Sequence, residues 1–195
     1  MDRPLGCAIG NSLEVLEAVS VLKGNEVPDF DRVCVALAST LLSLCYDISH
    51  EESEKRVLES IRSGAALAKF REWIKAQGGS DEFVDNPEAL GTAKYITEYK
   101  AQGSGYISFM NTEMIGKAAA ALGAGREKTT DSVDHTAGIV LRKKTGDAVR
   151  SGDVIAVLYT NKEASEIEAA RLLSEAITYS AEKPAEESLV YGIIK

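Results

Sequence analysis

A short loop near the start of the chain combines residue types that could hold a metal cation. Residues 4–11 read PLGCAIGN, and a helical pattern with Glu14 and Glu17 in its first two turns follows at once. Hard cations prefer oxygen ligands, and a tight loop can aim backbone carbonyls at one point while a nearby carboxylate completes the shell. Acidic residues in a first helical turn also complement the helix dipole without any ion. The spacing leaves both interpretations open, a monovalent cation site and an ordinary helix start.

The two histidines offer less chemistry. His50 falls in the first turn of a charged helix, where we expect it to face solvent. His135 lies beside Asp131 and Asp134, and a histidine oriented by a carboxylate can act as a general base. Because the sequence presents no evident nucleophile or metal partner, the favoured interpretation of His135 is a structural or surface residue.

Two glycine-containing segments match binding motifs only in part. LGAGREK, residues 122–128, is basic and glycine-rich, but it lacks P-loop spacing and closes a helix, so we interpret it as a helix end and a loop. Residues 143–160 have the turn spacing of biotinyl and lipoyl carrier domains and related barrel-sandwich folds. A carrier lysine stands on an exposed hairpin in a motif such as MKM, whereas Lys143 and Lys144 form an ordinary charged pair. We therefore interpret this segment as structural.

Up to about residue 90, the elements that would position these residues are helices. Apolar residues at spacings of three and four predict them, and capping residues or glycines mark their ends. One helix, from Phe30 to Leu44, is apolar on nearly all sides, which is typical of a helix inside a larger protein. The four predicted helices start at Asn11 or Ser12, at Pro28, at Ser49 and before Leu67, and the first, third and fourth end at Gly24, at Gly64 and at QGGSD.

Past residue 90, alternating β-branched and aromatic residues predict strands. Helices are predicted over Thr112–Leu122 and Glu163–Ile177. The predicted strands are KYITEY (94–99), GYISFM (105–110), three strands joined by two Gly-Asp turns within 138–160, and a final strand LVYGII (189–194).

Composition excludes several classes of partner. The 195 residues carry a net charge of -8, which argues against nucleic acid or an anionic membrane surface. No apolar run of about 18 residues predicts a membrane span, and the start lacks the pattern of a signal peptide. The three cysteines, Cys7, Cys34 and Cys45, form no CxxC pair, so we expect reduced thiols in a cytoplasmic protein.

Three stretches, in order along the chain, resemble motifs of the pyrimidine nucleoside phosphorylase and thymidine phosphorylase family. They are MDRPLGCAIGNSLEVLEAV (1–19), FREWIKAQGGSDEFVDNP (70–87) and LGAGREKTTDSVDHTAGIVLRKKTGDAVRSGD (122–153). The resemblance covers the C-terminal part of the family's chain, a little under half. It implies that residues 1–90 are the helical remainder of a split α/β phosphorylase domain. Residues 91–195 would then be an α+β domain with a barrel-sandwich-like β unit.

The resemblance also implies a reaction and an ion. The family splits a pyrimidine nucleoside with phosphate, giving the free base and a pentose 1-phosphate. Its phosphate- and base-binding residues lie upstream of the part that this chain resembles, so we expect no catalytic residue here and no activity from the chain alone. In members that bind potassium, the motif residues correspond to the backbone oxygens of Leu5 and Ala8 and the side chain of Glu17. The other ligands come from upstream, so the isolated site would be half built and empty.

Expectations about partners follow from the same resemblance. Family members form homodimers mainly through a helical lobe that this chain does not resemble. The exposed faces of the Phe30–Leu44 helix would therefore favour self-association of the chain alone. Two other classes stay open: a biotinyl- or lipoyl-type binding module, which a cofactor mass on Lys143 or Lys144 would support, and a regulatory protein that lost its catalytic half. An adjacent reading frame encoding the phosphate loop would favour the phosphorylase.

Overall fold

A computed structural model of the chain describes residues 3–126 and 132–192. The chain divides into two compact units. Unit 1 comprises Met1–Val15 and Leu90–Glu186, and unit 2 comprises Leu16–Ala89 and Glu187–Lys195. The expected family domains, 1–90 and 91–195, stay a prediction.

The helices that make up most of unit 2 have ends set by local residues. Pro28 stands in the first turn of its helix, where a missing amide hydrogen removes no helical bond. The Ser49 side chain accepts a 3.1 Å hydrogen bond from the Glu52 amide, and Gly64, with a φ of 75°, ends that helix. All four predicted helices are confirmed. They are α1 (Asn11–Leu22), which begins in unit 1, α2 (Pro28–Tyr46), α3 (His50–Arg62) and α4 (Ala65–Ala76), followed by the 3-10 helices η1 (Glu82–Val84) and η2 (Pro87–Leu90).

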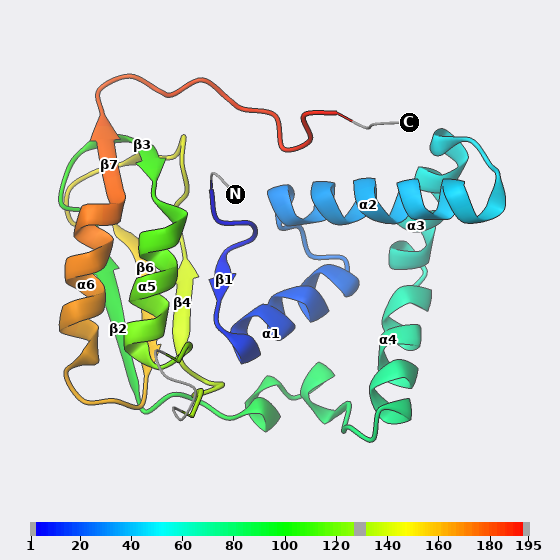
Figure 1. Cartoon of the computed structure of the whole chain (residues 1–195), viewed down its shortest axis with the longest axis horizontal. Coiled ribbons are helices and arrows are strands. Elements are labelled where there is room, and N and C mark those ends of the chain that lie inside the picture. The colour runs from blue at the N-terminus through cyan, green and yellow to red at the C-terminus, as the bar shows by residue number, and fades with distance from the viewer. Residues whose placement is uncertain (1–2, 127–131, 193–195) are drawn as a thin grey trace. The chain divides into compact units, whose positions relative to one another are not determined.

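Unit 1 is built on two antiparallel sheets (Figure 1). One has the strand order β1-β4-β6-β2, and the other has the order β5-β3-β7. The two Gly-Asp turns have the same form, because Asp147 and Asp153 each accept a hydrogen bond from the amide three residues earlier, at 2.7 and 2.8 Å. They lead into strands of different sheets, β5 and β6. The strands are β1 (Ala8–Ile9), β2 (Tyr95–Lys100), β3 (Gly105–Met110), β4 (Gly138–Leu141), β5 (Ala148–Val149), β6 (Val154–Thr160) and β7 (Ile177–Ser180).

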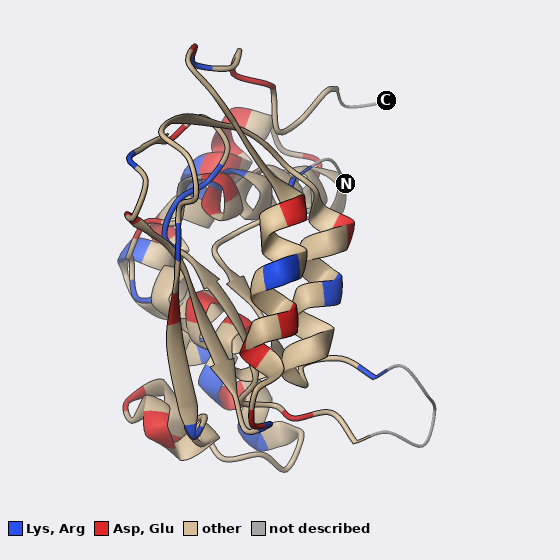
Figure 2. Cartoon of the chain, turned by 90° about the vertical axis from the view of Figure 1, so that its left-hand side faces the viewer, with Lys and Arg blue, Asp and Glu red and all other residues tan. Residues whose placement is uncertain are grey.

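The core of unit 1 lies between the sheets and two adjacent helices, α5 (Thr112–Leu122) and α6 (Ser165–Ala176). Leu122 and Leu173 are fully buried in it. Figure 2 shows charged residues along these helices, where Lys117 pairs with Glu113 at 2.6 Å. Each helix therefore presents an apolar face to the core and a charged face outward, as the predicted periodicity requires.

Three strands differ from the sequence-based expectation. β1 forms where a loop was expected, and β7 begins at Ile177, where the predicted second helix was to end. The predicted final strand is wrong for its described part, because residues 189–192 form no strand. Each difference concerns a short segment whose state depends on a distant pairing partner.

The mixed helix and sheet class is confirmed. Within the described residues, no single helix is long and apolar enough to cross a membrane, and only α2 and α3 taken together, with a bend of 119° between them, meet that test of length and composition. The three cysteines form no disulfide.

Candidate functional site

The loop at residues 4–11, called the opening loop below, belongs mainly to one sheet of unit 1. Its strand β1 forms an edge of that four-stranded sheet. In β1, Ala8 lies opposite Val140 and Ile9 opposite Ile139 of β4. The Leu141 amide donates a 2.8 Å hydrogen bond to the Cys7 carbonyl. Carbonyls alternate in direction along an antiparallel strand, so the Ala8 carbonyl is directed away from β4.

A lysine 140 positions after Pro4 also holds the loop. Lys144 Nζ donates hydrogen bonds to the Pro4 carbonyl, at 2.9 Å, and to the Gly6 carbonyl, at 2.6 Å. The loop therefore presents two backbone oxygens to a single positive charge. The sequence prediction missed this contact, since Lys144 was interpreted as part of an ordinary charged pair and no local spacing connects it to residue 4.

Two glycines allow the loop to approach β4 closely. Gly10 and Gly138 have φ values of 134° and 155°, which side chains rarely allow. A Cβ atom at Gly10 would lie 2.4 Å from the Ala137 carbonyl oxygen, and one at Gly138 would lie 2.2 Å from the Ile9 oxygen. Glycine is therefore required at both positions.

Polar contacts fix the start of α1. They give a structural role to Glu14 and to His135. Glu14 accepts a 2.9 Å hydrogen bond from the Gly10 amide, so it closes the first helical turn. The Ser12 amide donates to the His135 carbonyl at 3.0 Å, and the Asn11 side-chain amide lies 2.7 Å from His135 Nδ1. His135 is exposed and anchors the helix start, as the structural interpretation predicted. His50 is exposed, also as predicted.

Asp134 belongs to a separate network and does not orient the histidine through any described contact. It accepts from Asn161 Nδ2 at 2.7 Å and from the Thr136 hydroxyl at 2.9 Å. Burial acts to raise the pKa of Asp134, but these hydrogen bonds outweigh it and hold that pKa below its usual value. Asp131 lies outside the described residues. The arrangement therefore does not assemble the predicted general-base pair within the described part of the chain.

The predicted potassium ligands fall on both sides of the division of the chain. Leu5 lies between the two residues whose carbonyls Lys144 binds, Ala8 lies in β1, and Glu17 lies on α1 in unit 2. Among the described residues, no group of three or more histidines, cysteines or carboxylates could hold a metal ion. The predicted potassium site differs from such a group, because two of its three ligands are backbone carbonyls. It stays a prediction.

LGAGREK, the glycine-rich basic segment, closes a helix as predicted. Gly123, with a φ of 114°, follows α5, and its amide bonds to carbonyls of the last helical turn. Lys128 lies outside the described residues.

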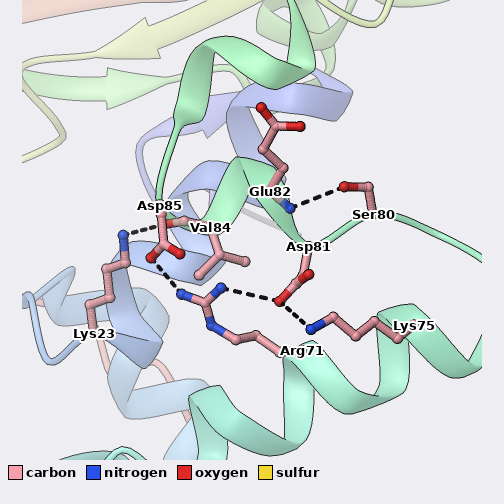
Figure 3. Close-up of polar contacts among 8 residues, drawn as sticks. All are labelled: Lys23, Arg71, Lys75, Ser80, Asp81, Glu82, Val84 and Asp85. Atoms are coloured by element: carbon pink, nitrogen blue, oxygen red, sulfur yellow. Dashed lines mark hydrogen bonds and ion pairs between the residues drawn. The ribbon is translucent and has the colours of Figure 1, made fainter.

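The second family-like stretch forms an ion-pair network in unit 2 (Figure 3). Arg71 on α4 bonds to Asp81 at 3.2 Å and to Asp85 at 2.5 Å, and Lys75 pairs with Asp81 at 3.1 Å. The hydrogen bond from Lys75, followed by that from Arg71, lowers the pKa of Asp81, and the bond from Arg71 lowers that of Asp85. Lys23 Nζ donates to the Val84 carbonyl. The network fixes the loop after α4 and has the character of a structural brace.

Comparison with known proteins agrees with the family resemblance of the sequence. Residues 106–180 match the pyrimidine nucleoside phosphorylase C-terminal domain family. The chain is 40% identical to a pyrimidine-nucleoside phosphorylase of Geobacillus stearothermophilus over 195 residues, which are 100% of this chain and 45% of that enzyme. It is 43% identical to the pyrimidine-nucleoside phosphorylase of Staphylococcus epidermidis over 169 residues, 86% of this chain and 39% of that enzyme.

These similarities indicate the class and the family that the chain resembles. The chain is similar over its whole length to an enzyme of the nucleoside phosphorylase class. Within that class, it is similar to the C-terminal portion of the pyrimidine nucleoside phosphorylases. The chain spans less than half the length of these relatives.

Proposed function

We propose that this chain is the C-terminal part of a pyrimidine nucleoside phosphorylase and is inactive alone. The observation that supports the proposal is 40% identity to such an enzyme across all 195 residues. In phosphorolysis a phosphate oxygen bonds to the anomeric carbon, the bond from that carbon to the base nitrogen breaks, and its electron pair leaves with the base. Cationic groups and hydrogen-bond donors must face the phosphate and the departing base. Those groups belong, in this proposal, to the part of the enzyme that this chain does not match.

The contribution of this chain would be a cation site at the opening loop. Leu5 and Ala8 would supply backbone oxygens and Glu17 a carboxylate, a donor set that suits potassium. A bound potassium ion would supply positive charge that braces the phosphate-binding loop. The loop suits this role because Lys144 engages the carbonyls of Pro4 and Gly6, and the strand ladder engages that of Cys7.

The test is reconstitution. This chain would be fused to, or co-expressed with, the portion of the Geobacillus stearothermophilus enzyme that it does not match. Phosphate-dependent release of uracil or thymine is then measured with and without potassium. We expect background release from the chain alone and potassium-stimulated release from the reconstituted enzyme. Turnover by the chain alone would contradict the proposed division of labour.

A carrier module with a barrel-sandwich fold is the second candidate. The repeated Gly-Asp turns favour it, but the Lys144 ammonium is engaged by two carbonyls and would have to leave them to carry a cofactor. Mass spectrometry after co-expression with a ligase tests it, since an added cofactor mass on Lys143 or Lys144 would support the module. A cytoplasmic location is part of the proposal, because the three cysteines have no CxxC spacing and form no disulfide.

A further inference from the structure

The longest helix of unit 2 has its apolar side turned outward. On α2, Leu37, Leu41 and Leu44 are 67, 63 and 78% exposed. On the opposite side Ser39 is fully buried, as is Ser53 of the neighbouring α3. The residues that usually form a core are therefore outside, and small polar residues are inside. This is the reverse of what a surface helix needs.

The outward side forms a continuous stripe without charge. At 3.6 residues per turn, seven apolar residues of α2 fall within a sector of about 120°. No residue from Val33 to Tyr46 is charged. The stripe continues into a groove of about 580 Å³ within unit 2, where Phe30 and Cys34 of α2 line one wall, and Leu22 and Ile61 belong to other helices. The α2 stripe comprises Phe30, Cys34, Leu37, Ala38, Leu41, Leu44 and Cys45.

The relatives are longer than this chain, and their additional portion is a candidate occupant of this surface. More than half of the Geobacillus stearothermophilus enzyme lies outside its match to this chain, although the match includes every residue of α2. We propose that the α2 stripe and its groove are the docking surface for that remaining portion of the phosphorylase polypeptide. The inference rests on the proposed function. The self-association expected of the chain alone would use the same surface in place of the proper occupant.

A natural cysteine of the chain can report whether this surface is covered. Cys45 is exposed at the end of the α2 stripe. Burial and, to a lesser degree, the Asp31 carboxylate raise the pKa of Cys34, which disfavours its reactive thiolate form. We therefore choose Cys45 for maleimide labelling, followed peptide by peptide with mass spectrometry.

The experiment compares the free chain with a fusion that joins it to the unmatched portion of the Geobacillus stearothermophilus enzyme. We expect Cys45 to label at least about tenfold more slowly in the fusion, at every protein concentration. A thiol introduced as Ile167→Cys is the matched control, because Ile167 of α6 is 69% exposed and lies in unit 1. Its labelling rate should be the same in both proteins.

A second pair of variants tests association of separate chains. Leu41→Glu should abolish co-purification with the unmatched portion, whereas Ile167→Glu should leave it intact. Helix content by circular dichroism confirms that each variant is folded. Loss of co-purification in both variants, or in neither, would contradict the assignment.

The outcomes separate the inference from the function. A fusion that is active but labels Cys45 at the free-chain rate overturns the docking surface and leaves the proposed function standing. A fusion with Cys45 protected but without phosphorolysis supports the surface and overturns the function. Protection that appears only in the free chain, and grows with its concentration, would show a second copy as the occupant and would also overturn the inference.

Discussion

The helices of unit 1 and unit 2 differ in the kind of residue that they bury. On α6, Leu173 is fully buried against the sheets, and the ion pair of Arg171 with Glu168 is exposed. On α2, Leu41 is exposed, and Ser39 is buried. On α4 no residue is fully buried. Unit 1 therefore completes a core from its own residues, whereas unit 2 turns apolar surface outward, which is the expected condition of an element whose packing partner lies elsewhere.

We expect the greatest loss of stability from a cavity in the core of unit 1. Leu173→Ala removes buried methyl groups and leaves a cavity, so we expect a loss of about 2–5 kcal/mol in the free energy of unfolding. Hydrogen exchange of the β6 amides measures it, since these amides belong to unit 1. A loss below about 1 kcal/mol would indicate that the two units are less different than proposed.

A second effect concerns the close approach of the opening loop to β4. Gly138→Ala places a methyl group against the Ile9 carbonyl at a positive φ, and we expect it to cost about 2–3 kcal/mol. Faster exchange of the Leu141 amide, which bonds to Cys7, is the specific readout. Gly152→Ala is the control, because its φ is also positive but nothing lies within 4 Å of the added carbon.

The lysine that holds the loop gives a smaller effect. Lys144→Met removes a charged donor shared by two carbonyls, and we expect a loss of about 1–2 kcal/mol, seen as local exchange in residues 4–9. In the reconstituted enzyme, the potassium concentration for half-maximal activity should rise. Lys143→Met, which removes a neighbouring charge without this contact, should change neither quantity.

Acid should weaken unit 2 through its ion-pair network. The lowered pKa values of Asp81 and Asp85 mean that their stabilising contribution is present above the ordinary aspartate pKa, near pH 4, and is lost as the pH falls through the lowered values. Trp73, the only tryptophan, reports on unit 2 by fluorescence. Arg71→Met should flatten this acid dependence, and Lys69→Met, which removes only an exposed pair with Glu72, should not.

We expect the smallest loss of stability at Leu41, which is exposed on α2. Leu41→Ala, the same chemical change as Leu173→Ala, should alter the stability of the dilute free chain by less than about 0.5 kcal/mol. Denaturation followed by Trp73 fluorescence measures it. A loss comparable with that at Leu173 would mean that Leu41 already has a partner within unit 2.

Local residues made most helices predictable, and distant partners decided the rest. The bounds of α5 follow from Asn111 as its cap and Gly123 as its end, both adjacent in sequence. β7 was missed because Ile177 continues the helical spacing of Leu173 and becomes a strand only by pairing with β3. Residues 189–192 have strand-like composition but no strand partner among the described residues. In the candidate site, the helix start was predictable, whereas the contact of Lys144 with Pro4 required the fold.

The distance along the chain between the opening loop and its anchors sets an order of events during synthesis. Residues 4–9 leave the ribosome before their anchors, since β4 and Lys144, which lies 140 positions after Pro4, emerge much later. The segments in between, α2 and α3, contact their neighbours in sequence and can form meanwhile. Closing so long a loop is slow, so the loop is expected to be among the last parts of the nascent chain to become ordered.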